Sequence, residues 1–144
     1  MVSAIALCLL GLLANMATEI LLQELAGLRG AGHKVDLIEE DGIANVILEN
    51  YPLPPTYNKQ STKLLLRIPI SYPNGNPDMF WTEADLLCAN GKTPTKADSL
   101  ENHVGQQWRR FSWHPKDWNP GTGNLCMYLE FVNCGLAKAG KNSQ

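Results

Sequence analysis

Cys126 stands at a position in the chain where a thiol could be activated as a nucleophile. A Pro-Gly-Thr-Gly turn over residues 120–123 comes just before it, and Asn124 is a favourable N-cap for a helix that begins beside it. In the first turn of such a helix, free backbone N–H groups and the helix dipole favour a thiolate over a thiol. The pattern therefore indicates a nucleophilic cysteine, while a small buried packing residue would show the same local pattern.

The segment that leads to Cys126 is rich in aromatic residues and turn formers. Three of the four tryptophans of the chain lie within residues 108–118, and a His-Pro step stands at His114-Pro115. The tryptophans could line the surroundings of a reactive group, or they could equally anchor the core of a small domain. Either interpretation gives this segment a central place in the structure.

Length and composition point to one compact domain that does not bind nucleic acid. The chain has 144 residues, of which 44% are hydrophobic and 18% charged, and this is enough to build a real core. Its 12 basic and 14 acidic residues give a net charge of −2, with no long run of Lys or Arg. Because phosphate binding needs a concentrated basic face, nucleic acid is not an expected partner.

The cysteines of the chain are scattered and form no CxxC pair. A disulfide scaffold would be denser, and a structural zinc site would usually show closely spaced pairs. The spacing of His114, Cys126 and Cys134 matches no common zinc pattern. We therefore expect reduced thiols in a cytoplasm, no metal and no cofactor, with Cys8, Cys88 and Cys134 as packing residues.

The first residues of the chain form an apolar leader. Residues 1–14 are almost wholly apolar but fall short of the roughly 20 residues that span a bilayer. No Lys or Arg precedes them, as a signal peptide would require, and Met16 opens a more ordinary start. We expect residues 1–15 to be dispensable, no stable membrane insertion, and one domain over residues 16–144. A secreted or envelope-tethered domain is an alternative that depends on residues 1–14 alone.

Hydrophobic periodicity in the first half of the chain predicts a helix followed by strands. An apolar stripe predicts a helix over residues 18–29 with Thr18 as its cap. The pattern then changes to that of strands over residues 35–39 and 43–48, which flank an Asp-Gly hairpin turn. The best strand pattern in the chain covers residues 63–70, where Pro69 indicates that the strand ends at a sheet edge.

The second half of the chain contains short strand patterns, a loop and a final helix. Residues 79–81 predict a fourth strand, and residues 85–88 are consistent with one more before the next turn. Residues 92–107 are polar and predict a surface loop. The order of elements is that of a single α+β domain. The final helix is predicted from an apolar stripe made by Leu125, Leu129, Val132 and Leu136.

Taken in order, these motifs resemble the ubiquitin-conjugating (E2, UBC-like) family, and specifically its prokaryotic members. The resemblance covers roughly residues 18–139, and it implies a fold with an N-terminal helix, a four-stranded antiparallel meander, an active-site loop and a C-terminal helix. The prokaryotic group is encoded beside ubiquitin-like proteins, an E1-like adenylating enzyme and a JAB-type peptidase. The motifs that carry the resemblance are Ile68-Pro-Ile-Ser-Tyr-Pro73, Pro77-Asp-Met-Phe-Trp-Thr82, Trp108-Arg-Arg-Phe-Ser-Trp-His-Pro115 and Leu125-Cys126-Met127.

The resemblance implies that Cys126 performs transthiolation. It would accept a ubiquitin-like protein from an E1-like enzyme as a thioester and pass it to a lysine of a target protein, in a bacterial pathway of the anti-phage type. A tetrahedral oxyanion must form in each step, and the backbone N–H groups of residues 121–124 and the Asn124 side chain are candidate donors. If Asn124 caps the helix its side chain is occupied, so these two roles compete.

The chain departs from the family pattern directly after the His-Pro step. Lys116 stands where the E2 pattern has an asparagine, so Asn119 or Asn124 would have to replace it, or neither does. His114 is expected to brace the loop rather than to act as a base. Asp117 could orient or deprotonate an incoming lysine, or it could be a solvated loop residue. A non-catalytic E2-like adaptor that binds the ubiquitin-like protein or the E1 is the alternative function.

Overall fold

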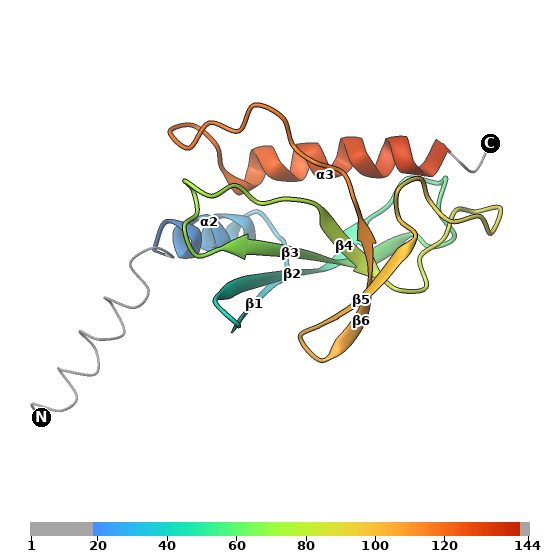
Figure 1. The fold of residues 1–144 in the computed structure, drawn as a ribbon, viewed down its shortest axis with the longest axis horizontal. Helices are drawn as coiled ribbons and strands as arrows, with labels where there is room; N and C mark the ends of the chain where they lie inside the picture. The colour runs from blue at the N-terminus through green and yellow to red at the C-terminus, as the bar shows by residue number, and fades with distance from the viewer. Residues whose placement is uncertain (1–18, 142–144) are drawn as a thin grey trace, which may run out of the picture.

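A computed structural model describes residues 19–141, which form two helices and a six-stranded antiparallel sheet (Figure 1). The apolar residues 1–15, with Cys8, and the predicted cap Thr18 lie outside the described residues. Within the described part, no helix is long and apolar enough to cross a membrane. The elements in chain order are α2 (Glu19–Gly30), β1 (Val35–Glu40), β2 (Ile43–Pro52), β3 (Ser61–Pro69), β4 (Phe80–Glu83), β5 (Ser99–His103), β6 (Gln106–Phe111) and α3 (Leu125–Gly140).

The first four strands form the predicted antiparallel meander. The strand order in the sheet is β1-β2-β3-β4-β6-β5, so β1 to β4 are neighbours in sequence order. The predicted hairpin turn at Asp41-Gly42 joins β1 to β2, and both residues have the positive φ that this turn needs, 56° and 73°. Tyr72-Pro73 follows the end of β3, as expected.

The sheet has more strands than the predicted four-stranded meander, because a further hairpin extends it. Residues 92–107, expected to be a surface loop, contain β5 and the beginning of β6, which pair in an antiparallel register. The connecting turn at Val104-Gly105 has φ values of 47° and 79°. A β-branched residue rarely adopts positive φ, and Val104-Gly105 is not the Asn-Gly or Asp-Gly pair that marks such a turn. This hairpin therefore has no turn signal in the sequence. Residues 85–88 are not a strand, since Cys88 makes only an isolated bridge to Tyr57.

The strand register divides the apolar side chains between the two faces of the sheet. Val46 lies opposite Leu66 and Leu48 opposite Leu64, and these residues join both helices in the main core. The alternate positions point to the other face, because successive side chains of a strand alternate in direction. There a second, smaller cluster forms from Ile47, Leu65, Trp81 and Trp108.

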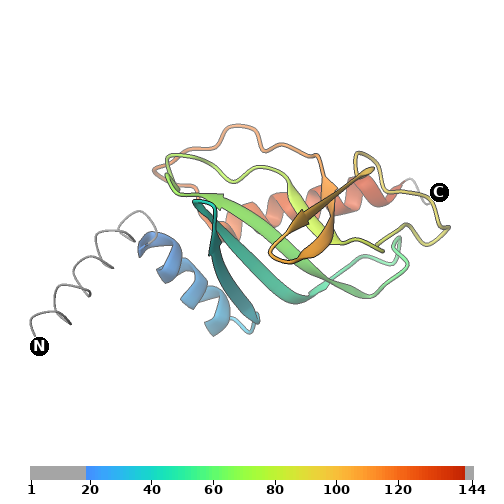
Figure 2. The ribbon, with the colours of Figure 1, turned by 60° about the horizontal axis from the view of Figure 1, so that its bottom comes forward.

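Helix α3 lies along one face of the sheet (Figures 1 and 2). Leu125, Leu129, Val132 and Leu136 are all buried, which confirms the helix prediction. The C-terminal half of α3 is also tied to the loop after β2, because the Tyr57 hydroxyl donates to the Leu136 carbonyl at 2.6 Å. This packing fixes the axis of the helix that carries Cys126.

Gly135 lies against Phe80 of β4, and its substitution tests the packing of α3 on the sheet. An added Cβ would lie 3.0 Å and 3.1 Å from two ring carbons of Phe80, a fully buried side chain stacked on Phe111. We expect Gly135→Ala to lower the free energy of unfolding by about 1–3 kcal/mol, as overpacking does. In the matched control, Gly27→Ala in α2, the new methyl meets nothing within 4 Å, so stability should rise by about 0.5–1 kcal/mol. Urea unfolding measures both, and a Gly135→Ala protein at least as stable as wild type would contradict the packing.

Candidate active site

Cys126 is exposed and lies in the first turn of α3. Asn124 is the N-cap of this helix, with extended backbone (φ −152°, ψ 173°), and its side-chain oxygen accepts the Met127 N–H at 2.9 Å. The predicted cap is therefore confirmed. Among residues 19–141 the Cys126 N–H has no hydrogen-bond acceptor, as is usual for the first turn of a helix. The site thus presents a thiol with a free amide donor beside it.

The Asn124 side chain can fill two roles at once, because its amide carries both an oxygen acceptor and a separate N–H₂ donor. The oxygen is occupied by the helix cap. The amide nitrogen donates to no other group in the described part of the chain. The expected competition between capping and oxyanion binding therefore does not arise, because the cap uses the oxygen, whereas an oxyanion would accept from the N–H₂ group, which has no acceptor within residues 19–141.

The backbone amides before Asn124 are not free, contrary to the expectation for residues 121–123. The Gly121 N–H donates to the Asn119 side-chain oxygen at 2.9 Å. The Thr122 and Gly123 amides donate to the Asn119 carbonyl at 3.1 Å and 2.6 Å. Asn119 therefore closes the turn that precedes the cysteine, and its side-chain oxygen and carbonyl are both committed to that turn.

Glu24 of α2 reaches the beginning of α3, a contact that the sequence patterns did not reveal. Its Oε1 accepts the Leu125 N–H at 2.6 Å, and both its oxygens accept the Tyr72 hydroxyl at 2.8 Å. A carboxylate at the N-terminus of a helix is stabilised by the free amides and the helix dipole. One side chain therefore fixes the first helical amide, the loop after β3 and α2 relative to one another.

Tyr72 is buried near Cys126 and is kept neutral. Its ring is 2% exposed. Burial raises the pKa of Tyr72 far above its ordinary value, and the hydrogen bond and negative charge of Glu24, followed by the proximity of Cys126, raise the pKa further. The hydroxyl therefore remains a proton donor to Glu24 at physiological pH, next to Cys126.

The loop from Ser112 to Asn124 runs beside the loop that follows β3 (Figures 1 and 2). The Trp118 indole N–H donates to the Pro73 carbonyl at 2.8 Å, and its ring packs 6.0 Å from that of Tyr72. Gly123 lies against the same indole, so close that an added Cβ would come within 2.6–2.8 Å of ring carbons. Trp118 thus acts as a packing anchor, and glycine is needed at position 123 because the backbone touches the ring.

His114 and Asp117 lie on the surface of this loop. The His114 Nδ1 is 2.7 Å from the Asp78 carboxylate, and the two side chains are 62% and 46% exposed. No hydrogen bond of the described residues joins His114 to Cys126. This geometry suits the expected bracing role, since it links the two neighbouring loops. Asp117 is exposed, with a φ of 60°, and it makes no ion pair within residues 19–141.

The cysteines other than Cys126 differ in their surroundings. Cys88 is fully buried, in agreement with a packing role. Cys134 was expected to be a packing residue as well, but it is exposed, two turns after Cys126 on α3. Cys134 follows the buried Val132 by two positions, about 200° around the helix, so it lies on the side opposite to the apolar stripe. No group of three or more His, Cys, Asp or Glu side chains in residues 19–141 is arranged to hold a metal ion.

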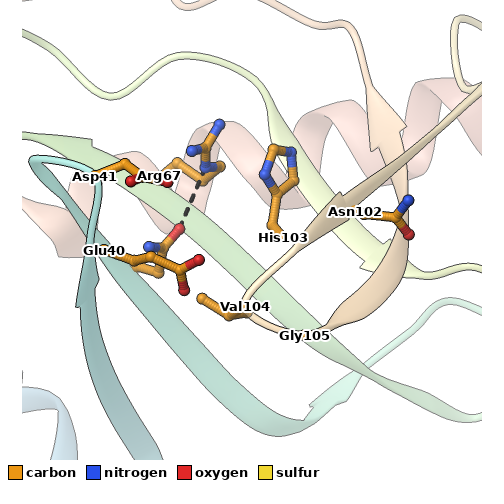
Figure 3. Close-up of a pocket in the computed structure, with 8 residues that line it drawn as sticks. Glu40, Asp41, Arg67, Asn102, His103, Val104 and Gly105 are labelled. Carbon is orange, nitrogen blue, oxygen red and sulfur yellow. Dashed lines mark hydrogen bonds between the residues drawn. The ribbon is translucent and has the colours of Figure 1, made fainter.

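A hollow on the sheet face that carries Trp81 contains none of the predicted site residues (Figure 3). Arg67 donates through Nε to the Asn45 side-chain oxygen at 3.2 Å, and its guanidinium lies 5.8 Å from the Trp81 ring centroid. Glu40 and Asp41 line the same hollow, so its charges are mixed. This hollow therefore has structural contacts but lacks a nucleophile.

The fold and the cysteine together define a class of protein: an α+β domain in which an exposed cysteine lies in the first turn of a helix, directly after a loop held by hydrogen bonds. The chain belongs to the prokaryotic E2 family E, whose family model matches residues 22–139. Comparisons with curated proteins and with solved structures found no match. Membership confirms the resemblance and places the protein in an E2-like functional class, whose partners are in general ubiquitin-like proteins and E1-like enzymes.

Removal of the Glu24 carboxylate should destabilise the site. Glu24→Ala leaves the Tyr72 hydroxyl and the Leu125 amide without their acceptor, which should cost about 1.5–3 kcal/mol of unfolding free energy. Gln23→Ala, on the exposed side of the same helix, should stay within about 0.5 kcal/mol of wild type. Tyr72→Phe should cost less in the Glu24→Ala background than in wild type, because the two side chains share one hydrogen bond. Additive effects of the two changes in urea unfolding would contradict the contact.

Proposed function

We propose that this protein is an E2-type conjugating enzyme that carries a ubiquitin-like protein on Cys126. It receives that protein from an E1-like enzyme and transfers it to a lysine of a target, in the cytoplasm, as part of a bacterial ubiquitin-like pathway of the anti-phage type. The observation that supports this most is the exposed thiol at the start of α3, beside the Cys126 N–H and the Asn124 N–H₂ group, neither of which has an acceptor within residues 19–141. Family membership supports the general class of reaction.

The reaction would proceed in two balanced steps. In the first, the Cys126 sulfur forms a bond to the carbonyl carbon of the E1 thioester, the bond to the E1 sulfur breaks, and the proton lost by Cys126 ends on the E1 thiol. In the second, the target amine forms a bond to the same carbon and loses a proton, while the bond to Cys126 breaks and its thiol is regenerated. No oxidant, reductant or metal is required.

Asn124 and the Cys126 amide are the donors best placed to stabilise the oxyanion of both steps. They belong to the rigid beginning of α3, so they need not reorganise when negative charge develops. Asn124 would thereby replace the asparagine of the family pattern, while Asn119 supports the turn. His114 would brace the loop through Asp78, and Asp117, exposed on the same loop, would attract the target ammonium group.

The alternative function is that of an adaptor that binds the ubiquitin-like protein or the E1 without forming a thioester. Its support is the replacement of the family asparagine by Lys116 and the engagement of the residue 121–123 amides within their own turn. The two functions differ in the reactivity of Cys126, which can be tested directly.

Cys126→Ser is the test of the catalytic function. Wild type incubated with its cognate E1, ATP and ubiquitin-like protein should form a conjugate that reductant removes. Cys126→Ser should form no conjugate, or one that resists reductant, because thiols do not cleave an oxygen ester as readily. Cys134→Ser is the matched control, since Cys134 is exposed on the same helix, and it should behave as wild type. A reductant-sensitive conjugate formed by Cys126→Ser at the wild-type rate would leave only the adaptor function.

Asn124 variants can separate helix capping from oxyanion stabilisation. Asn124→Ala removes both roles, so it should lose about 0.5–2 kcal/mol of stability and slow transfer. Asn124→Asp keeps an oxygen for the Met127 amide and lacks the N–H donor, so its stability should be preserved. Transfer by Asn124→Asp should still fall on the order of a hundredfold or more, measured as single-turnover discharge of the thioester. Discharge at the wild-type rate would exclude this role for Asn124.

A further inference from the structure

We propose that a basic groove along α3 selects the target segment, and that the segment carries acidic residues about four or five positions from its acceptor lysine. The groove lies between α3 and the loop from Ser112 to Asn124, which run beside each other (Figures 1 and 2). This inference rests on the proposed function, because it names the target that would receive the ubiquitin-like protein.

The wider part of the groove is a hollow of about 440 Å³ with a marked positive charge. Lys96, Lys116 and Lys138 line it together with His114, and no Asp or Glu of residues 19–141 does so. The floor is aromatic, since Trp113 and Phe131 also face the hollow. Such a concentration of lysines is unusual on a chain whose net charge is −2, so it does not follow from the overall composition.

The three lysines have no ion-pair partner among the described residues. Lys96 is held by a cation–π contact, with its Nζ 4.9 Å from the Trp113 ring centroid. The Trp113 indole is fixed in turn by its N–H, which donates to the Thr95 carbonyl at 3.1 Å. Like charges that converge on one hollow repel one another and attract anionic groups. A segment with carboxylates is therefore the occupant that complements this surface.

The groove continues from the basic hollow towards Cys126. A second hollow, of about 130 Å³, shares Pro115, Lys116 and Phe131 with the first. It is also lined by Gly123 and Met127, which lie on either side of Cys126 in the chain, and by further loop residues. A bound segment could thus extend from the basic hollow to the surroundings of the thiol.

The positive charge falls along this path. Asp117 and Lys116 both line the hollow near Cys126, whereas Lys96 and Lys138 line only the wider hollow, where no acidic residue of 19–141 accompanies them. A lysine ammonium would be attracted to Asp117, and carboxylates to the far end. This pattern favours a target segment over the tail of the ubiquitin-like protein, because that tail is joined to Cys126 through its carboxyl end and need not present an amine.

The length of the path sets the spacing in the target. Cys134 and Lys138 follow Cys126 by eight and twelve positions. At about 1.5 Å per helical residue, they lie about 12–18 Å further along α3. An extended peptide covers about 3.3 Å per residue, so the carboxylates should stand about four or five residues from the acceptor lysine.

The test uses binding of fluorescent peptides to the full chain, measured by anisotropy at low salt without E1 or ATP. Two test peptides each carry one lysine and two glutamates. In one peptide the glutamates stand four and five positions after the lysine, and in the other they stand four and five positions before it. Each test peptide has two controls. One carries glutamines in place of the glutamates, and the other carries the glutamates one and two positions from the lysine. We expect at least one spaced-glutamate peptide to bind about five- to tenfold more tightly than both of its controls. Equal binding of glutamate and glutamine peptides would overturn the groove, and equal binding of both glutamate spacings would overturn the geometry.

Charge removal identifies the surface involved. Lys116→Gln combined with Lys138→Gln should abolish the preference for glutamate, whereas Lys34→Gln combined with Lys92→Gln, at exposed sites outside the groove, should keep it. A preference that survives the first pair of changes would overturn the proposal. Thioester formation by the groove variants is measured separately and should equal wild type. Glutamate-selective peptide binding by a protein that forms no thioester would reject only the catalytic function. Thioester formation by a protein that does not select glutamate peptides would reject only the groove.

Discussion

The carboxylate of Glu24 is the contact on which the candidate active site most depends. It comes from α2, yet it accepts the first amide of α3 and the hydroxyl of Tyr72, which are 101 and 48 residues away in the chain. A negative charge at this end of a helix is favourable, and the neutral tyrosine supplies a further donor. The start of α3 is thereby fixed against α2 and the loop after β3, so the residue that follows, Cys126, has a defined position.

Around this contact the polar groups fall into two sets. Those that shape the loop are satisfied: Trp118 donates to Pro73, His114 meets Asp78, and Asn119 closes the turn before the cysteine. Those at the thiol are open, since the Cys126 amide and the Asn124 N–H₂ group have no acceptor within residues 19–141. A rigid support with free donors at its end is the arrangement expected of a site that stabilises a transient oxyanion. It also leaves the neighbouring groove open along α3.

The parts of the structure that follow from local pattern were predictable from the sequence. The Asn124 cap, the buried stripe of α3 and the Asp41-Gly42 hairpin each depend on residues a few positions apart. Glu24 could not be recognised, because an exposed-looking glutamate on an amphipathic helix carries no mark of a partner 101 residues away. The β5–β6 hairpin was missed because its turn uses Val104 at positive φ and its first strand is polar and half exposed. Cys134 was expected to be a packing residue only because cysteine is usually buried, although it lies on the exposed side of α3.

The most direct measurement locates the thioester on a single sulfur. One variant keeps Cys126 as its only cysteine through Cys8→Ser, Cys88→Ala and Cys134→Ser, and its counterpart keeps only Cys134 through Cys8→Ser, Cys88→Ala and Cys126→Ser. The buried Cys88 is changed identically in both, so any loss of stability there is matched. Intact-mass spectrometry after reaction with E1, ATP and the ubiquitin-like protein should show a reductant-labile adduct on the Cys126 variant alone. An adduct on the Cys134 variant with none on the Cys126 variant would contradict the account.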